Sequence, residues 1–474
     1  MKRLFFLVLF LVSLSAVQAH PWKPNHFVII DTDGGVDDFR AISMMLASPD
    51  IRVLGITVTP GVLPASEAYS RVKALLKTFY HEGIPVGLNE NAAIKPANFD
   101  GARNFVWGQA GGDVNTHQIQ ALDVIRYIYK HSSDSIHLVC LGSLNIVSTA
   151  TKVENFGNKT AEIIWSCGNT KNTGSFNYSI DKDAYKNAAK LEVPIRMIDG
   201  ATIRQEAFES PFAEKLDQMH ILYAQEIRRS LGADHKIFYD ELVPLWMHFP
   251  GMFNISNAGD VQSITLNSAL PDGDIRDAYL KIIAGETVNQ NQVINFSWRK
   301  EDYFPDVQPI MDETIKKYGK AEWVAEAMAN ELHRHLGVFA IVGTKMGIRA
   351  KEYFNAGIDE MKILSYAGNI PPFSCMNDGL QVSTGATVGH GLISVSPDTV
   401  VRPVADFTYM GRTIRLTLKP EFGKKIATEV KELNKIHGLS SDIYWELIRK
   451  LAVKYWASFD RREIFTIEEI GKIL

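Results

Sequence analysis

The stretch Val28–Ile42, VIIDTDGGVDDFRAI, places four aspartates within eight residues, directly after an apolar run. They are Asp31, Asp33, Asp37 and Asp38. Carboxylates held this close raise one another's pKa unless a cation lies among them. An aspartate is common at the start of a helix, but four in this spacing fit that role poorly. The stretch therefore predicts an all-oxygen metal site of the kind that Ca²⁺ prefers.

Strand-like and helix-like segments alternate through the first half of the chain. Apolar, β-branched runs of strand length occupy 26–33, 51–58, 84–88, 135–142, 161–168 and 193–199. Segments with helical spacing of apolar residues lie between them, at 37–48, 65–83 and 117–132. This alternation predicts an α/β domain whose mainly parallel sheet carries helices on both faces. Ligands bind such sheets beyond the carboxyl ends of the strands, where the aspartates fall.

The length of the chain, 474 residues, predicts two domains. We expect a first domain at 20–290, a linker at 291–315 and a second, smaller α/β (α+β) domain at 316–474. The polar segment 254–274 is expected to contain few strands, and helices are expected to extend to the C-terminus. The formal net charge of −4 gives no reason to expect nucleic acid or an anionic membrane as a partner.

The first 19 residues have the pattern of a secretory signal peptide. Lys2 and Arg3 precede an apolar core, and the Val-Gln-Ala ending suits cleavage after Ala19. No later stretch is long and apolar enough to cross a bilayer, so we expect a protein exported to the periplasm or the cell exterior. The sequence is also compatible with assembly into a homo-oligomer.

Several motifs give the first domain a family resemblance. The segments are DTDGGVDD at 31–38, GITVTPGV at 55–62, LGSLNIVSTA at 141–150, GSFNYSIDKDA at 174–184 and FYDELVPLW at 238–246. Residues 26–255 resemble the inosine–uridine-type nucleoside hydrolases. The resemblance implies a Ca²⁺-dependent hydrolase that cleaves the N-ribosidic bond of a nucleoside or related small-molecule riboside.

The resemblance also implies roles for individual residues. Asp33 would be a Ca²⁺ ligand and the general base that takes a proton from the attacking water. Asp38 and Asp240 would be further carboxylate ligands, and Asn145 would contribute its backbone carbonyl. Asp37 and Asn177 would bind ribose hydroxyl groups.

Other positions depart from the family pattern. Val62 stands in place of a ribose-contacting Asn, Ser175 in place of a Glu, and Tyr239 in place of a late His. Tyr239 is the aligned candidate for contact with the leaving group, and stacking on a base is open to Trp107, Trp165 or Trp246. These departures support an alternative: a Ca²⁺-dependent protein that binds ribosides without turnover. Asp33, which a binding protein would not need as a base, supports the enzyme.

A second group of metal-ligand residues lies in the last third of the chain. His333 and His335 lie in an HRH motif, and Cys375 begins CMNDGLQVSTG. Imidazole and thiolate together suit Zn²⁺ or another transition metal. Residues 320–410 resemble the FmdE family of formylmethanofuran dehydrogenase proteins, which implies a metal-binding domain. Further candidate ligands are Asp378 and His390. Another reading makes this domain the active part, with the first domain supplying its substrate.

Arg334 stands where that family has Gly. The family's Gly is expected to serve a positive φ angle, which would place the arginine in a backbone conformation that side chains rarely adopt.

Overall fold

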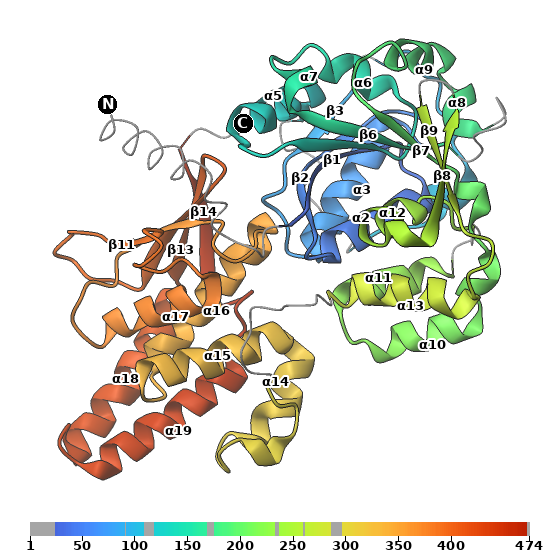
Figure 1. Ribbon diagram of the computed structural model, residues 1–474. Helices are drawn as coiled ribbons and strands as arrows, with labels where there is room; N and C mark the ends of the chain where they lie inside the picture. Colours follow the sequence, from blue (N-terminus) through green and yellow to red (C-terminus); the bar gives the residue numbers. More distant parts are fainter. Residues whose placement is uncertain are drawn as a thin grey trace, which may run out of the picture.

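The computed structural model describes residues 24–90, 92–108, 118–167, 175–232, 237–258, 261–285 and 296–471. The expected signal peptide, 1–19, and the expected linker residues 291–295 lie outside the described residues. Within the described part of the chain, no helix has the length and apolar character that a membrane span requires. Figure 1 shows two domains, each built around its own sheet.

The first domain contains a nine-stranded sheet of order β4-β3-β2-β1-β5-β6-β7-β9-β8. Every neighbouring pair is parallel except β8 and β9, which confirms the expected mainly parallel sheet. The strands are β1 (His26–Thr32), β2 (Ile51–Val58), β3 (Val86–Leu88), β4 (Ile119–Gln120), β5 (Ile136–Cys140), β6 (Thr160–Ser166), β7 (Ile195–Ile198), β8 (Phe253–Ala258) and β9 (Val261–Leu266).

Helices cover both faces of this sheet. Successive side chains of a strand point to opposite faces, so Val28 and Ile30 of β1 join one hydrophobic core and Ile29 joins the other. The helices packed on the side of Val28 include α2 (Val36–Ala47), α3 (Ala65–Thr78), α10 (Ser210–Gln218), α11 (Leu222–Ser230), α12 (Leu242–His248) and α13 (Asp272–Ile283). The other core includes α5 (Ala121–His131), α6 (Asn145–Ala150), α7 (Phe156–Lys159) and α9 (Lys182–Ala188). Two short helices, α4 (Asp100–Asn104) and α8 (Phe176–Ser179), lie near the carboxyl ends of the strands.

The expectation of few strands at 254–274 is wrong. β8 and β9 form an antiparallel hairpin at the edge of the first sheet, and β9 pairs with β7. The polar residues that obscured the strands lie on β8, where Asn254, Ser256 and Asn257 are exposed. An edge strand that is open to solvent tolerates such polar residues.

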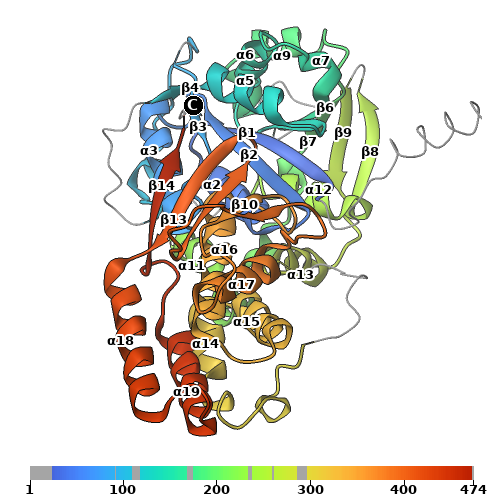
Figure 2. The same cartoon turned by 90° about the vertical axis from the view of Figure 1, so that its left-hand side faces the viewer.

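The second domain contains a five-stranded mixed sheet of order β11-β10-β12-β13-β14. Its strands are β10 (Lys362–Ser365), β11 (Ile393–Val395), β12 (Val404–Tyr409), β13 (Arg412–Leu418) and β14 (Phe465–Ile470). Its helices are α14 (Met311–Tyr318), α15 (Lys320–His333), α16 (Val338–Phe354), α17 (Met376–Thr384), α18 (Pro420–His437) and α19 (Asp442–Ser458). In both Figure 1 and Figure 2, the hairpin of α18 and α19 is the part of this domain farthest from the first domain.

Two features of the second domain differ from expectation. Val307 and Met311, which fall within the expected linker, belong to the hydrophobic core of this domain. The described chain ends in strand β14 rather than in helices, because Phe465 and Ile467 pack on the same core and β14 pairs with β13.

The second domain contacts the amino ends of the strands of the first sheet. Arg52, near the start of β2, donates to Glu360 at 3.0 Å. Gly83, just before β3, donates its backbone N–H to the carbonyl of Tyr353 at 2.8 Å. These contacts leave the carboxyl ends of the strands uncovered by the second domain.

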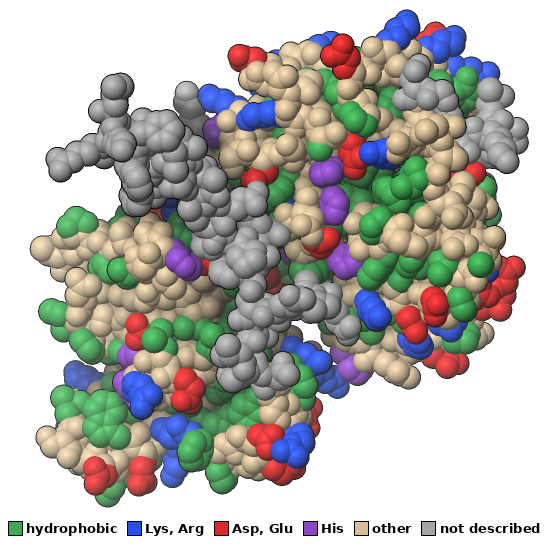
Figure 3. Space-filling model, viewed as in Figure 1, with side chains coloured by type: hydrophobic (Ala, Val, Ile, Leu, Met, Phe, Trp, Pro, Cys, Tyr) green, Lys and Arg blue, Asp and Glu red, His purple; other side chains and the backbone are tan. Residues whose placement is uncertain are grey.

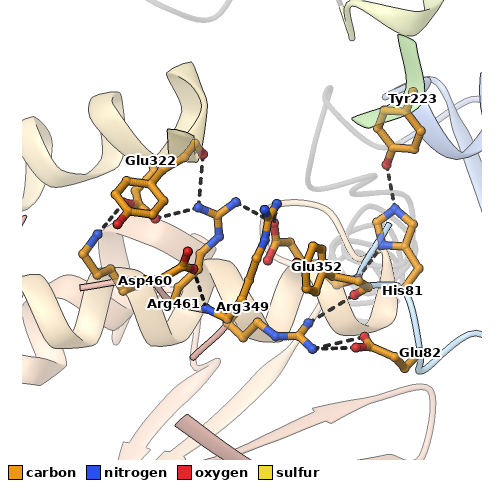
Figure 4. A network of polar contacts seen from close by, with 12 residues as sticks. His81, Glu82, Tyr223, Glu322, Arg349, Glu352, Asp460 and Arg461 are labelled. Carbon is orange, nitrogen blue, oxygen red and sulfur yellow. Dashed lines mark hydrogen bonds and ion pairs between the residues drawn. The ribbon is translucent and has the colours of Figure 1, made fainter. Parts of the chain in front are cut away.

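A buried histidine lies within this interface. His81 Nδ1 is 2.6 Å from the carbonyl oxygen of Glu352, and Nε2 is 2.6 Å from the hydroxyl of Tyr223 (Figure 4). The neutral imidazole satisfies both contacts when Nδ1–H donates and Nε2 accepts. Arg349 lies beside it and donates to Glu82 at 2.9 Å. Burial lowers the pKa of His81 from 6.5 to about 4.

The first prediction concerns pH. Because the folded pKa of His81 lies below the unfolded one, the unfolded chain gains a proton first as the pH falls. Stability from this group is therefore complete above about pH 6.5 and is lost toward pH 4. The loss is about 3 kcal/mol in the free energy of unfolding. We expect the free energy of unfolding, measured with denaturant, to differ less between pH 7 and pH 4 in His81→Gln than in the unmodified protein. His131→Gln, at an exposed histidine, is the control, and equal differences in all three proteins would contradict the prediction.

Candidate functional site

A cavity of about 450 Å³ opens at the carboxyl ends of the central strands of the first sheet. Its polar wall contains Asp33, which follows β1, and the first turn of α2. Asp240, just before α12, lies on the same wall. The chain thus brings together Asp33, Asp37 and Asp38 with one aspartate from a segment about 200 residues later.

Asp33 is held between two glycines. A Cβ atom at Gly61 would collide with Asp33 Oδ2, and one at Gly142 would lie 3.0 Å from the same oxygen. The Asp33 backbone carbonyl accepts from the N–H of Leu63 at 3.0 Å, which fixes the main chain here. Asp33 Oδ2 is buried and has no hydrogen-bond partner. Burial, reinforced by Asp38, raises the pKa of Asp33 well above its ordinary value.

Three further carboxylates converge beside Asp33. Asp37, Asp38 and Asp240 each offer an oxygen, and these oxygens lie within 4.8 Å of one another. One oxygen of Asp38, Oδ2, accepts from Thr32 Oγ1 at 2.6 Å, and Asp240 Oδ1 accepts from Ser166 Oγ at 2.6 Å. The pKa of Asp240 is raised by burial and then by Asp37, and the pKa of Asp37 is raised to about 8 by burial and then by Asp38.

A hard divalent cation fits this donor set. It would neutralise carboxylates that otherwise repel one another, and it would give the orphaned oxygen of Asp33 a partner. Within the described residues, Asp37, Asp38 and Asp240 are the one set of three His, Cys, Asp or Glu side chains whose ligand atoms all lie within 4.8 Å of one another.

A buried ion pair supports the wall behind the cluster. Arg40 Nε donates to Glu241 Oε1 at 2.5 Å, and both side chains are fully buried. The second carboxylate oxygen of Glu241 accepts from the backbone N–H of Tyr239 at 2.9 Å. This pair therefore fixes the loop that carries Tyr239 and Asp240 into the cavity. Sequence reasoning missed Arg40 and Glu241, although a charged residue in the apolar stripe of α2 was a usable signal.

Asp31 lies behind the cavity and does not line it. Its Oδ1 accepts from Thr57 and Thr59, at 2.7 and 2.9 Å. Burial raises the pKa of Asp31 to about 8.

The residues expected around the ribose are only partly assembled. Asn177 lines the cavity, and its Nδ2 donates to the carbonyls of Leu141 and Ser166, at 2.5 and 2.9 Å. Val62 and Ser175 also line the cavity. Ser175 caps α8, since its Oγ accepts from the N–H of Tyr178.

Asn145 is not among the residues that line the cavity. Its carbonyl accepts from Ser148 Oγ at 2.8 Å, and its side chain bridges Asn89 and Asp181. Its expected role as a carbonyl ligand therefore stays a prediction.

Part of the cavity lining is aromatic. Phe99 and Phe176 line it, with ring centroids 5.3 Å apart, and Phe99 is half exposed at 49%. Backbone hydrogen bonds from Ala97 to Gly61 and from Asn98 to Val62 hold the segment that carries Phe99. No local pattern in the sequence indicates this, because the contact joins segments 77 residues apart.

The tryptophans considered for base stacking lie elsewhere. Trp107 and Trp165 are buried in the two cores of the first domain. Trp246 packs edge-on against Phe253 and does not line the cavity. Tyr239, by contrast, does line it.

The second domain brings part of its expected group together. The rings of His333 and His335 lie 4.3 Å apart, and His333 Nδ1 is 2.7 Å from Asp378 Oδ2. Cys375 is half-buried at the start of α17, one turn before Asp378. Burial raises the pKa of its thiol. His390 lies apart from this group and pairs with Asp359.

Arg334 explains how the two histidines come together. His333 is the last residue of α15, and Arg334 adopts the left-handed conformation with φ of 63°. The arginine therefore takes up the positive φ angle that was expected for the family's glycine. The chain turns at this point, so that His333 and His335 face the same side.

Comparison with known proteins identifies both domains. A family model described as inosine-uridine preferring nucleoside hydrolase matches residues 28–308. A second, described as FmdE, molybdenum formylmethanofuran dehydrogenase operon, matches residues 332–458. The chain belongs to the inosine-uridine preferring nucleoside hydrolase family and carries a fused FmdE domain. Both matches confirm the resemblances and extend beyond residues 255 and 410.

The individual relatives are distant. The chain is 24% identical over 208 residues to the inosine-uridine preferring nucleoside hydrolase of Leishmania major, covering 40% of this chain and 64% of that protein. It is 24% identical over 175 residues to uridine nucleosidase 1 of Arabidopsis thaliana, covering 35% of this chain and 52% of that protein. The chain thus spans about half to two thirds of these curated relatives.

Solved structures of nucleoside hydrolases also match the first domain. A plant nucleoside hydrolase aligns with a TM-score of 0.46 and 17% identity, over 56% of this chain and all of that one. The inosine-uridine preferring nucleoside hydrolase of Bacillus anthracis aligns with a TM-score of 0.43 and 16% identity, over 55% of this chain and all of that one.

The second prediction concerns the packing around Asp33. Gly61→Ala adds a methyl group where Asp33 Oδ2 lies, so either the carboxylate or the chain must move. We expect a loss of about 1–3 kcal/mol in the free energy of unfolding, which is typical of overpacked sites. Denaturant unfolding checks this. Gly157→Ala, at a site with open space around it, is the control. Equal stability of the two variants would contradict the assigned packing.

Proposed function

We propose that the protein is a Ca²⁺-dependent hydrolase that cleaves the N-ribosidic bond of a nucleoside or related riboside. The observation that carries this proposal is the convergence of Asp37, Asp38 and Asp240 beside a buried, unpartnered oxygen of Asp33. Membership of the nucleoside hydrolase family supports it. When bound, Ca²⁺ supplies positive charge that orients the sugar hydroxyl groups and the attacking water.

Within this proposal each carboxylate has a distinct role. Asp38 and Asp240 hold the cation, and their hydrogen bonds from Thr32 and Ser166 keep them in place. Asp33 takes the proton of the attacking water at Oδ2, the oxygen that accepts no hydrogen bond from the protein. Because burial and the neighbouring carboxylates disfavour its charged form, Asp33 becomes a usable base only once a cation offsets that repulsion.

Other residues bind the sugar and the leaving group. Asp37 and Asn177 line the cavity and accept hydrogen bonds from the ribose hydroxyl groups, Asn177 through Oδ1 because both N–H groups of its Nδ2 already donate to the protein. Phe99 and Phe176 form the aromatic wall on which a flat nucleobase packs. Tyr239 lies on the same cavity and contacts the leaving group. An aromatic heterocycle is therefore the leaving group that the cavity suits best.

The unpartnered Asp33 oxygen also weighs against the alternative of riboside binding without turnover. A binding protein needs the cation and the sugar contacts, but it has no use for a carboxylate placed to accept a proton from water. Val62 and Ser175 restrict the sugar contacts without removing this base.

The third prediction tests the base. Asp33→Asn keeps an oxygen ligand but cannot accept a proton, so turnover should fall by ~10²–10⁴-fold. Release of reducing sugar from a panel of purine, pyrimidine and pyridine ribosides measures it. The variant should still bind ribosides in equilibrium dialysis. Asp38→Ala is the matched variant that should lose bound calcium and turnover together.

Two results would contradict this function. Turnover of Asp33→Asn equal to that of the unmodified protein would remove Asp33 as the base. Riboside binding by the unmodified protein, with no turnover of any member of the panel, would favour the binding protein instead.

We further propose that the second domain binds a transition metal through His333, His335 and Cys375. The pairing of His333 with Asp378 supports this, because a carboxylate behind a metal-ligating histidine fixes its orientation. His333 Nε2 is buried and has no protein partner, which leaves it available as a ligand. Cys375, one turn before Asp378, would supply the thiolate, and loss of its proton would accompany binding. Zn²⁺ suits this ligand set.

The basic and apolar pattern of residues 1–19 supports export to the periplasm or cell exterior as the protein's location.

The fourth prediction tests the second-domain site. We expect the purified full-length protein to contain zinc, nickel or iron, and His335→Gln and Cys375→Ser to lower that content at least tenfold. Elemental analysis by mass spectrometry measures it. His390→Gln should leave the content unchanged, because His390 lies apart from the group. Equal metal content in all four proteins would remove this site.

A further inference from the structure

The carboxylate cavity carries more negative charge than one divalent cation balances. Asp33, Asp37, Asp38 and Asp240 all line it. If all four are ionised around one Ca²⁺, two negative charges remain. The buried Arg40 in the wall behind them is already paired with a carboxylate of its own, so it does not cancel this surplus. A bound ligand therefore experiences a negative field even when the cation is present.

The rest of the lining does not offset this charge. Among the residues that the structure describes, no lysine, arginine or histidine lines the cavity. Figure 3 shows acidic and basic side chains mixed over one face of the molecule, and the formal net charge of the whole chain is only −4. The surplus is thus local to the cavity. An anionic group, such as the phosphate of a nucleotide, meets repulsion there, whereas a cationic group is attracted.

The aromatic part of the lining adds to this preference. Phe99 and Phe176 both line the cavity, and their ring planes lie at 53° to each other with centroids 5.3 Å apart. The face of an aromatic ring carries partial negative charge and attracts a cation within about 6 Å of its centre. A flat heterocycle that carries a positive charge gains both ring packing and this attraction.

We propose that the preferred substrates of the cavity are ribosides whose base is a positively charged heterocycle, of the class of N-ribosylpyridinium ions. This inference rests on the proposed hydrolysis of N-ribosidic bonds at the same site. It orders three classes of compound by charge: cationic ribosides bind best, neutral nucleosides bind less well, and phosphorylated ribosides bind poorly.

A cationic base also simplifies the chemistry at the leaving group. The water oxygen forms a bond to the anomeric carbon while the bond from that carbon to the ring nitrogen breaks. The electron pair of the broken bond goes to the nitrogen and cancels its positive charge, and Asp33 takes the proton of the water. The products are ribose and a neutral heterocycle, so no acid is needed. A neutral nucleobase would instead leave as an anion and would require a proton from a general acid.

The test compares three probes that share one ring: the riboside of nicotinamide, which is cationic; its reduced dihydro form, which is neutral and of nearly the same shape; and its phosphorylated form. Binding is measured by equilibrium dialysis with excess Ca²⁺ and full-length Asp33→Asn, which is expected to bind without appreciable turnover. Three carboxylates still face the cation in this variant. We expect the cationic riboside to bind at least tenfold more tightly than either of the other two probes.

A second variant tests the aromatic contribution. Phe99→Leu, added to Asp33→Asn, keeps an apolar side chain but removes the ring face. It should weaken binding of the cationic riboside about 2–5-fold more than binding of the neutral form, which is the range for a cation over an exposed ring. Phe304→Leu, at an exposed aromatic residue that does not line the cavity, is the control and should change neither.

The affinity ratio decides the inference because it does not depend on how readily each bond to nitrogen breaks. Equal or tighter binding of the neutral form overturns the charge preference and leaves the proposed hydrolysis standing. If the unmodified protein turns over no riboside, the proposed hydrolysis fails instead, and the affinity ratio still decides the charge preference. If none of the three probes binds, both are overturned.

Discussion

The packing of Asp33 between two glycines is the constraint on which the first domain depends. β1 is flanked by β2 and β5, and the chain leaving each neighbour supplies a residue without a side chain, Gly61 and Gly142, against the same carboxylate. That space lets a charged group sit at the end of the central strand with one buried oxygen that has no hydrogen-bond partner. The rest of the site is arranged around it: α2 begins three residues later, and the loop before α12 brings Asp240 alongside.

The carboxylate cluster is costly to ionise. Burial raises the pKa of Asp33, Asp37 and Asp240, so ionising all of them brings repulsion that a divalent cation would offset in part. The Arg40–Glu241 pair keeps the backbone in place in either state, because it is neutral as a pair and fully buried. The protein thus separates two tasks: an ion pair maintains the loop, and the carboxylates remain available for the ion.

Much of this arrangement was predictable from the sequence, and the reason is local. The period of apolar residues shows β1, α2 and β2 directly, and the aspartate spacing places Asp33, Asp37 and Asp38 at a strand end. Contacts between distant segments were not predictable in this way. Phe99 reaches Phe176 only because backbone hydrogen bonds tie residues 97–98 to 61–62. Trp107 was considered for base stacking, but it is buried in the hydrophobic core. The polar strand β8 was missed because an edge strand has no buried face to set a pattern. For His333 and His335, the decisive fact is the left-handed backbone of Arg334, which the family's glycine at this position indicates although an arginine disfavours it.

The way the two domains meet determines how molecules can move between their sites. The second domain contacts Arg52 and Gly83 at the amino ends of the strands, whereas the cavity opens at their carboxyl ends. A seven-residue strand such as β1 separates the two edges by about 20 Å, and the sheet with its packed helices fills that distance. A compound released from the cavity leaves on the side of the sheet away from the second domain, so the arrangement of the described residues favours supply of the two domains in equal amounts over direct transfer between them.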